Sequence, residues 1–219
     1  MSQFNVNSQA HKEYLTRRER DNQRTAIIEK FTDNIYKNNG FDYQRVTDRR
    51  MQTKGVDIVH RVNGITRYVD EKFAIQYYNK DLFTFAFELS SKNNKDESGW
   101  FLSDHMITTH YAVLWFKADD DFKNIYEYDL CYIDKQKLKD YLKTVGYYDG
   151  LLDDFNKYWE YRWYTHPDST YYEKNNRRYK TLKNGVKIVQ SMQFEVESPI
   201  NVVIPRRELY KLAEYHFHN

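Results

Sequence analysis

The spacing of apolar residues along the first half of the chain predicts one long helix followed by short strands. Apolar residues recur at helical spacing from Ile27 to Ile35, and Gly40 supplies a stop, so we expect a helix over residues 13–38. A shorter helix is expected over residues 100–107. Strand patterns, either alternating or wholly apolar, occupy residues 41–47, 56–62, 66–75, 83–89 and 109–116.

The second half of the chain contains two segments that each predict a short strand running directly into a helix. They cover residues 128–142 and 201–212, with Asp134 as the N-cap of the first helix and Pro205 near the start of the second. Residues 146–185 lie between them, are rich in tyrosine, and are expected to form an aromatic and basic insertion. His216 and His218 near the C-terminus could bind a metal adventitiously, but a frayed tail is the favoured interpretation.

Composition limits the class of protein. The chain has 219 residues, of which 40% are hydrophobic and 30% charged, enough for one domain over residues 1–219. No apolar run approaches the roughly 18 residues that a membrane span requires, and no signal-peptide pattern is present, so we expect a cytoplasmic protein without membrane contact. With Cys131 as the only cysteine, an internal disulfide is impossible and a cysteine-based zinc site is disfavoured.

A hairpin in the first half places two aspartates opposite each other. Asn63-Gly64 between two strand patterns is a strong signal for a type I′ turn, because both turn positions need positive φ. Val62 then pairs with Ile65, and the same register brings Asp57 opposite Asp70. Directly opposed residues have Cβ atoms roughly 4.5–5.5 Å apart, where two carboxylates repel unless a cation or proton lies between them.

Lys72 follows Asp70 on the same face of the predicted strand, since side chains repeat every two residues. Two carboxylates and one amine are the groups that metal-assisted phosphodiester hydrolysis needs. Asp57 and Asp70 would hold Mg²⁺, which Mn²⁺ can replace, and Lys72 would position the attacking water or neutralise charge on the phosphate. The competing interpretation is a surface hairpin with ordinary charges and a salt bridge from Lys72 to an aspartate.

The same residues resemble the PD-(D/E)XK nuclease superfamily, in particular its Holliday-junction-resolvase-like and phage-type branches. The resemblance rests on Gly55-Val56-Asp57 opening a strand, on Asp70-Glu71-Lys72 after the turn, and on the preceding helix. It implies an α/β fold with a restriction-endonuclease-like core, in which a central mixed sheet begins with an antiparallel meander and is flanked by helices. The middle residue of the motif is usually apolar, so Glu71 requires either an open face or an arginine partner.

Two further glutamates are candidate metal ligands. The resemblance implies that a glutamate on the first helix can approach the metal, which makes Glu29 a candidate, although a surface acid is the simpler interpretation. Glu88 lies on the polar face of the strand predicted at 83–89 and could supply a third acid.

A basic strip at residues 174–187 carries six cations and no acid, interleaved with tyrosine, as suits a phosphate backbone and stacked bases. The candidate nucleic-acid-binding residues are Lys174, Arg177, Arg178, Lys180 and Lys183. A second cluster from Arg17 to Arg24 is diluted by acids, and a solvated helix face explains it better. For the strip, a solvated loop is an equal alternative.

Together these patterns predict a Mg²⁺-dependent endonuclease that acts on DNA, with selectivity for DNA structure left open. Two alternatives remain, a catalytically inactive nucleic-acid-binding module with the same fold and a nuclease that cleaves RNA. The sequence does not distinguish a monomer from a homodimer.

Overall fold

A computed structural model describes residues 6–90, 99, 101–161, 170–192 and 199–219, with only the backbone described for residues 6–21. The described helices are α1 (Val6–Asn38), α2 (Arg49–Gln52), α3 (Lys135–Thr144), α4 (Leu151–Glu160) and α5 (Arg206–Leu212), with short 3-10 turns η1 (Ile75–Tyr77) and η2 (Lys183–Gly185). The strands are β1 (Asp42–Arg45), β2 (Ile58–Val62), β3 (Ile65–Phe73), β4 (Thr84–Ser90), β5 (His110–Ala118), β6 (Ile125–Asp134), β7 (Tyr171–Lys174), β8 (Arg177–Thr181), β9 (Lys187–Ser191), β10 (Ile200–Pro205) and β11 (Ala213–His218).

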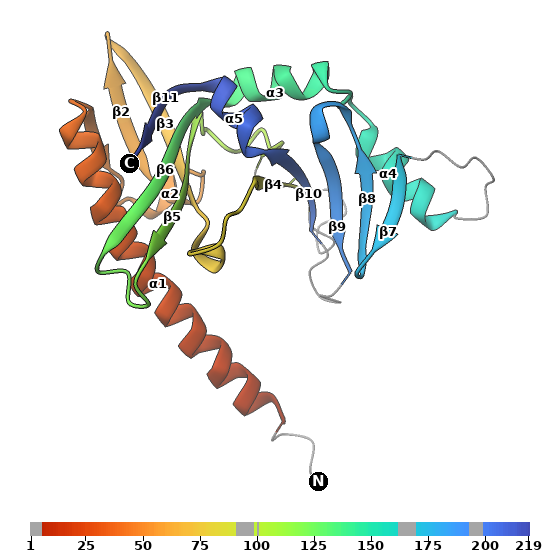
Figure 1. Cartoon of the computed structure of the whole chain (residues 1–219), viewed down its shortest axis with the longest axis horizontal. Helices are drawn as coiled ribbons and strands as arrows, with labels where there is room; N and C mark the ends of the chain where they lie inside the picture. Colours follow the sequence, from red (N-terminus) through yellow and green to blue (C-terminus); the bar gives the residue numbers. More distant parts are fainter. Residues whose placement is uncertain (1–5, 91–98, 100, 162–169, 193–198) are drawn as a thin grey trace.

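The strands form a six-stranded sheet in the order β1-β2-β3-β5-β6-β11 and a five-stranded sheet in the order β4-β10-β9-β8-β7 (Figure 1). In the six-stranded sheet β1, β2 and β3 form the expected antiparallel meander, and β5 then runs parallel to β3. The α/β class and the mixed central sheet flanked by helices are therefore confirmed. Helix α1 covers one face, where Ile28 and Ile35 pack against Val69 and Leu114.

The predicted register of the hairpin is confirmed, because Val62 pairs with Ile65 and Ile58 pairs with Val69. Both turn residues, Asn63 and Gly64, have positive φ as a type I′ turn requires. The regular ladder stops at Ile58, one residue short of the position that the sequence pattern predicts for Asp57.

The expected insertion at residues 146–185 contributes α4 and the antiparallel strands β7 and β8, and β9 follows it directly. These elements share a hydrophobic cluster with the other face of the six-stranded sheet. That cluster joins Phe155 of α4, Ile188 of β9 and Val202 of β10 to Tyr111 and Val113 of β5. The described part of the insertion is thus built into the same core.

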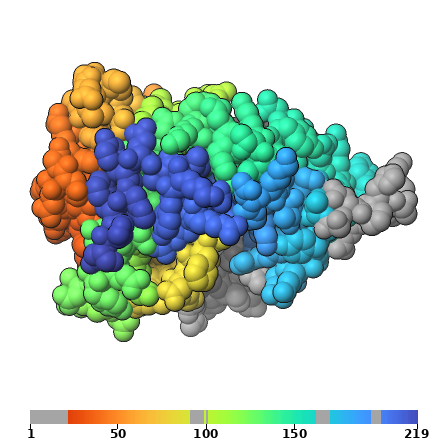
Figure 2. Space-filling view, turned by 45° about the horizontal axis from the view of Figure 1, so that its top comes forward, coloured from red at the N-terminus to blue at the C-terminus, as the bar shows by residue number. Residues whose placement is uncertain are grey.

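The C-terminal segment joins the two sheets, which contradicts the expectation of a frayed tail. Strand β10 belongs to the five-stranded sheet, α5 follows at once, and β11 pairs with β6 at the edge of the six-stranded sheet. Figure 2 shows this segment, in dark blue, lying between the N-terminal elements and the light-blue strands of the insertion. His216 also contacts Asp129 through an Nε2 to Oδ1 distance of 2.7 Å.

The short helix expected over residues 100–107 is wrong, since the described residues of this segment form turns and irregular backbone. Its backbone N–H groups bond to distant segments of the chain or close tight turns. Phe101 N donates to Glu88 O, and Ile107 N donates to Lys54 O. Hydrogen bonds to other parts of the fold have replaced the intrahelical ones, so the apolar pattern here reflects burial instead of helix formation.

Candidate active site

Asp70 and Lys72 lie side by side on the face of β3 opposite α1. Lys72 Nζ is 2.8 Å from Asp70 Oδ1, and the Asp70 side chain is only 6% exposed. Burial raises the pKa of Asp70 to about 6 against the opposing effect of Lys72, and the charge and hydrogen bond of the neighbouring Asp57 raise it further. The two aspartates and the lysine of the sequence pattern are therefore brought together.

Asp57 reaches this group from a bend that precedes β2. Its N–H donates to Val69 O, and its carbonyl accepts from Val46 N, which fixes the backbone on both sides. Its Oδ2 accepts a hydrogen bond from the N–H of Glu71 at 2.7 Å. The bend turns the carboxylate back toward β3, so Asp57 meets Asp70 through its side chain without a regular ladder pair.

Gly55 allows this close approach. It has φ +76° and is buried, and a Cβ at this position would lie 2.6 Å from Thr108 Oγ1 and 3.7 Å from Asp70 Oδ2. The Thr108 hydroxyl donates to the carbonyl of Gly55 over 2.6 Å. A glycine is thus needed here both for the backbone conformation and for the space beside Asp70.

The Glu71 side chain is buried and pairs with an arginine, which is one of the two arrangements that the sequence allowed. Its Oε2 is 2.6 Å from Arg45 Nη1, and its Oε1 accepts from the hydroxyls of Thr32 at 2.9 Å and Tyr36 at 3.0 Å. Burial raises the pKa of Glu71, while Arg45 lowers it. Arg45 also pairs with Asp33 at 2.8 Å, so a polar cluster links α1, β1 and β3.

Lys135 is a buried cation that the sequence pattern did not single out. It is the first residue of α3, is 6% exposed, and its N–H donates to Thr109 O. Burial lowers the pKa of Lys135 to about 8. The charge of Lys72 also lowers this pKa, and the charge of Asp70 raises it. The sequence did predict Asp134 as the N-cap of this helix, which the structure confirms. That prediction could have drawn attention to Lys135, because the residue after the N-cap begins the helix at the end of β6.

The two other predicted acids lie on different sides of this group. Glu29 of α1 is 3.8 Å from Arg45, and burial raises its pKa with a contribution from Asp57. Glu88 of β4 lines a cavity of about 380 Å³ together with Lys72 and Tyr111. The charge of Asp57 thus acts on Glu29, and Glu88 lines the same cavity as Lys72.

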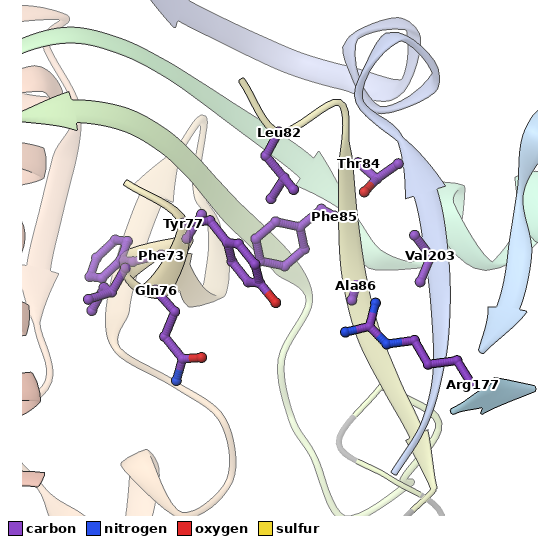
Figure 3. Close-up of a pocket in the computed structure, with 11 residues that line it drawn as sticks. Phe73, Gln76, Tyr77, Leu82, Thr84, Phe85, Ala86, Arg177 and Val203 are labelled. Atoms are coloured by element: carbon purple, nitrogen blue, oxygen red, sulfur yellow. The ribbon is translucent and has the colours of Figure 1, made fainter. Parts of the chain in front are cut away.

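A second cavity, of about 500 Å³, continues from there along β4 and η1 (Figure 3). Phe73 and Tyr77 form one wall, and Ala86, Val203 and Arg177 form the opposite one. Figure 3 shows the Arg177 side chain extending from β8 toward Ala86 of β4. The cavity thus joins the end of β3, where Lys72 lies, to the five-stranded sheet.

The structure distributes the predicted basic strip over the two faces of the five-stranded sheet and the η2 turn. Lys174 and Arg177 are exposed, and Lys183 is exposed in the η2 turn. Arg178 lies over the Trp159 ring of α4 at 5.3 Å, and Lys180 lies 3.9 Å from the centre of the Tyr171 ring. Arg178 and Lys180 therefore face the α4 side, which the run of charges did not reveal.

The N-terminal cluster is described only at Arg24, whose guanidinium lies over the Phe122 ring at 4.8 Å and donates to Asp120 O. The side chains of Arg17, Arg18 and Arg20 lie outside the described residues. Among the residues that the structure does describe, Arg24 packs against aromatic rings instead of forming an isolated basic patch.

His110, Asp134 and Glu214 form a separate group that could hold a metal ion, on the α1 side of the six-stranded sheet. Their ligand atoms all lie within 4.8 Å of one another, and the buried His110 Nε2 has no hydrogen-bond partner. Arg67 Nη1 lies 2.8 Å from Glu214, and burial and the Arg67 charge lower the pKa of His110. The guanidinium competes with a cation for Glu214, so the group is a weaker candidate than the aspartate pair.

No helix among the described residues has the length and apolar character needed to cross a membrane. Comparison of the chain with protein-family models, with curated proteins and with solved structures finds no match.

Proposed function

We propose that this protein is a Mg²⁺-dependent nuclease that hydrolyses phosphodiester bonds in DNA. The observation that carries the proposal is the pairing of Lys72 Nζ with the buried Asp70 Oδ1 at 2.8 Å, with the Asp57 carboxylate acting on the same aspartate. A salt bridge on a solvated hairpin would not bury Asp70 beside a second acid, because burying like charges together is costly.

The aspartate pair fits a hard divalent cation. Asp70 Oδ1 pairs with Lys72 and Asp57 Oδ2 accepts from Glu71, and each carboxylate has a second oxygen that can serve as a ligand. Bound there, Mg²⁺ would polarise the phosphate with its positive charge and lower the pKa of a bound water molecule. A cation bound at the pair would favour the ionised form of Asp70 and so lower its raised pKa.

The residues around the pair hold it in position. The Glu71 carboxylate is fixed by Arg45, Thr32 and Tyr36, which locks the middle of the motif onto α1. Asp70 and Lys72 precede and follow Glu71 on the strand, so their side chains are directed to the opposite face. Lys72 can then orient the attacking water or stabilise charge on the phosphate oxygens.

The arrangement of the elements supports a restriction-endonuclease-like core. A helix precedes an antiparallel meander, and a strand parallel to β3 follows it in the same sheet. Asp57 lies in the bend that leads into the second strand of this unit, and Asp70, Glu71 and Lys72 lie on the third, which is the order that the resemblance to PD-(D/E)XK nucleases implies.

The test is a cleavage panel with the full chain. Plasmid, single-stranded DNA, a four-way junction and RNA are each incubated with Mg²⁺, Mn²⁺ or a chelator. We expect cleavage of at least one DNA substrate with either cation and none with chelator. Cleavage of RNA and of no DNA substrate would show that the protein is an RNA-cleaving nuclease. Binding without any cleavage would favour an inactive nucleic-acid-binding module.

A further inference from the structure

The period of two along β8 places Arg177 on one face of the strand and Arg178 and Lys180 on the other. Arg178 pairs in register with Gln190, and Lys180 pairs with Ile188, and both partners are buried on the α4 side. Alternation therefore directs Tyr179 and Arg177 to the other side. On that outer face β9 shows half-buried residues at each alternate position, including Lys187.

Two tyrosines lie at the centre of this outer face. Tyr172 of β7 pairs directly with Tyr179 of β8, and their rings are stacked at 4.7 Å with an angle of 6° between planes. Lys187 Nζ lies 5.7 Å from one ring centre and 5.9 Å from the other. The exposed cations Lys174 and Arg177 lie at the β7–β8 turn. We call these five residues the platform.

The platform leads to the candidate active site through the strand register. Tyr179 pairs with Val189, which pairs with Asn201, which pairs with Glu88 of β4. Asn201 and Glu88 line the same cavity as Lys72. Arg177 lines the adjoining cavity, where Figure 3 shows its side chain extending toward Ala86 of β4.

We propose that the platform binds a single-stranded stretch of the DNA substrate and guides it toward Lys72. This inference rests on the proposed nuclease function for its substrate class. Bases stack on the tyrosine pair, which an intact duplex does not permit because its bases are already stacked. Phosphates contact Lys174, Arg177 and Lys187, since cations that track a backbone release its counterions.

The test measures binding in chelator, so that it does not depend on cleavage. Fluorescence anisotropy compares a labelled oligo(dT) of about 20 nucleotides, long enough for the site sizes that single-strand binders cover, with a duplex of the same length across a salt series. We expect the full chain to bind the single strand more tightly. The double variant R177A/K187A should reduce the dependence of log K on log salt by about 1.4, at roughly 0.7 for each lost contact.

A tyrosine variant separates stacking from charge. Tyr179→Leu should weaken oligo(dT) binding by about five-fold or more, and should leave the salt slope unchanged, because one stacked base contributes about 1–3 kcal/mol. Lys157→Ala on α4 is the matched control, since Lys157 is exposed and lies away from the outer face. This variant should bind oligo(dT) with the affinity and the salt slope of the unsubstituted chain.

The outcomes separate the two proposals. Equal affinity for duplex and single strand, or an unchanged salt slope in R177A/K187A, would overturn the platform even if the protein cleaves DNA. If the platform variants behave as expected and no substrate is cleaved with any cation, the nuclease proposal fails and the platform stands. Thermal denaturation of each variant excludes unfolding as the cause.

Discussion

The backbone N–H of Glu71 donates to the side chain of Asp57 across 2.7 Å, which links the two halves of the candidate motif directly. The carboxylate of Glu71 is at the same time held by Arg45 on the opposite face of β3. One residue thus fixes Asp57 through its backbone and anchors the strand through its side chain. The acid at the middle of the motif has a positioning role in this chain.

If the proposed function holds, Asp57→Asn, Asp70→Asn and Lys72→Ala should each reduce cleavage by roughly 100-fold or more with little loss of fold, because each removes a proposed metal ligand or the proposed catalytic amine. Single-turnover cleavage and circular dichroism measure the two properties. Asp153→Asn on the exposed surface of α4 is the control and should retain full activity. Full activity of the Asp70→Asn protein would exclude the site as described.

Asp70→Asn should stabilise the metal-free protein at neutral pH. The folded-state pKa of Asp70, about 6, exceeds its ordinary value of 3.8, so its contribution to stability is full below pH 3.8 and is lost as the pH rises through 6. A shift of this size corresponds to about 3 kcal/mol as an upper limit. Denaturant unfolding in chelator should show a gain over the unsubstituted chain that is small near pH 4 and reaches about 1–3 kcal/mol near pH 7. A gain that does not change with pH would contradict the assignment.

Mg²⁺ should raise the melting temperature through the aspartate pair, because a ligand that binds only the folded state stabilises it. Asp57→Asn should abolish this increase. His110→Ala should preserve it, since His110, Asp134 and Glu214 form a separate group. The reverse result, with the increase lost only in His110→Ala, would place the ion at the histidine.

The Arg45 and Glu71 pair should show strong coupling in a double-mutant cycle. Arg45→Met leaves a buried carboxylate without its cation and should cost about 3–5 kcal/mol of unfolding free energy. Adding Glu71→Leu should recover much of that loss, because a buried pair is often replaceable by apolar residues. Additive losses in urea unfolding would show that the two side chains act independently.

Gly55→Ala and Gly40→Ala form a matched pair. Both glycines have positive φ, at +76° and +71°, but of the two only Gly55 has atoms within 4 Å of the methyl group that alanine would add, the nearest being Thr108 Oγ1. The Gly40 variant should therefore lose about 1 kcal/mol from backbone strain, and the Gly55 variant about 1–3 kcal/mol more from the clash. Equal losses on urea unfolding would show that the contact with Thr108 relaxes freely.

Local sequence determined the hairpin and with it the central part of the candidate site. Asn63-Gly64 permits the turn, and the period of two then fixes the faces of Asp70 and Lys72. The long helix and the two strand-to-helix units were predictable for the same reason, because caps and periodicity act over a few residues. The sequence also showed that Glu71 needs a partner if buried, without identifying Arg45 among several arginines.

The features of the site that depend on segments far apart in the sequence were decided only by the tertiary structure. The bend at Asp57, the burial of Lys135 where the charge of Asp70 acts on it, and the pairing of β11 with β6 depend on contacts across many residues that no local pattern encodes. A run of like charges carries no information about which face its members occupy until the strand is placed in a sheet. Register with the buried Ile188 and Gln190 turned Arg178 and Lys180 inward, and left Arg177 beside the cavity.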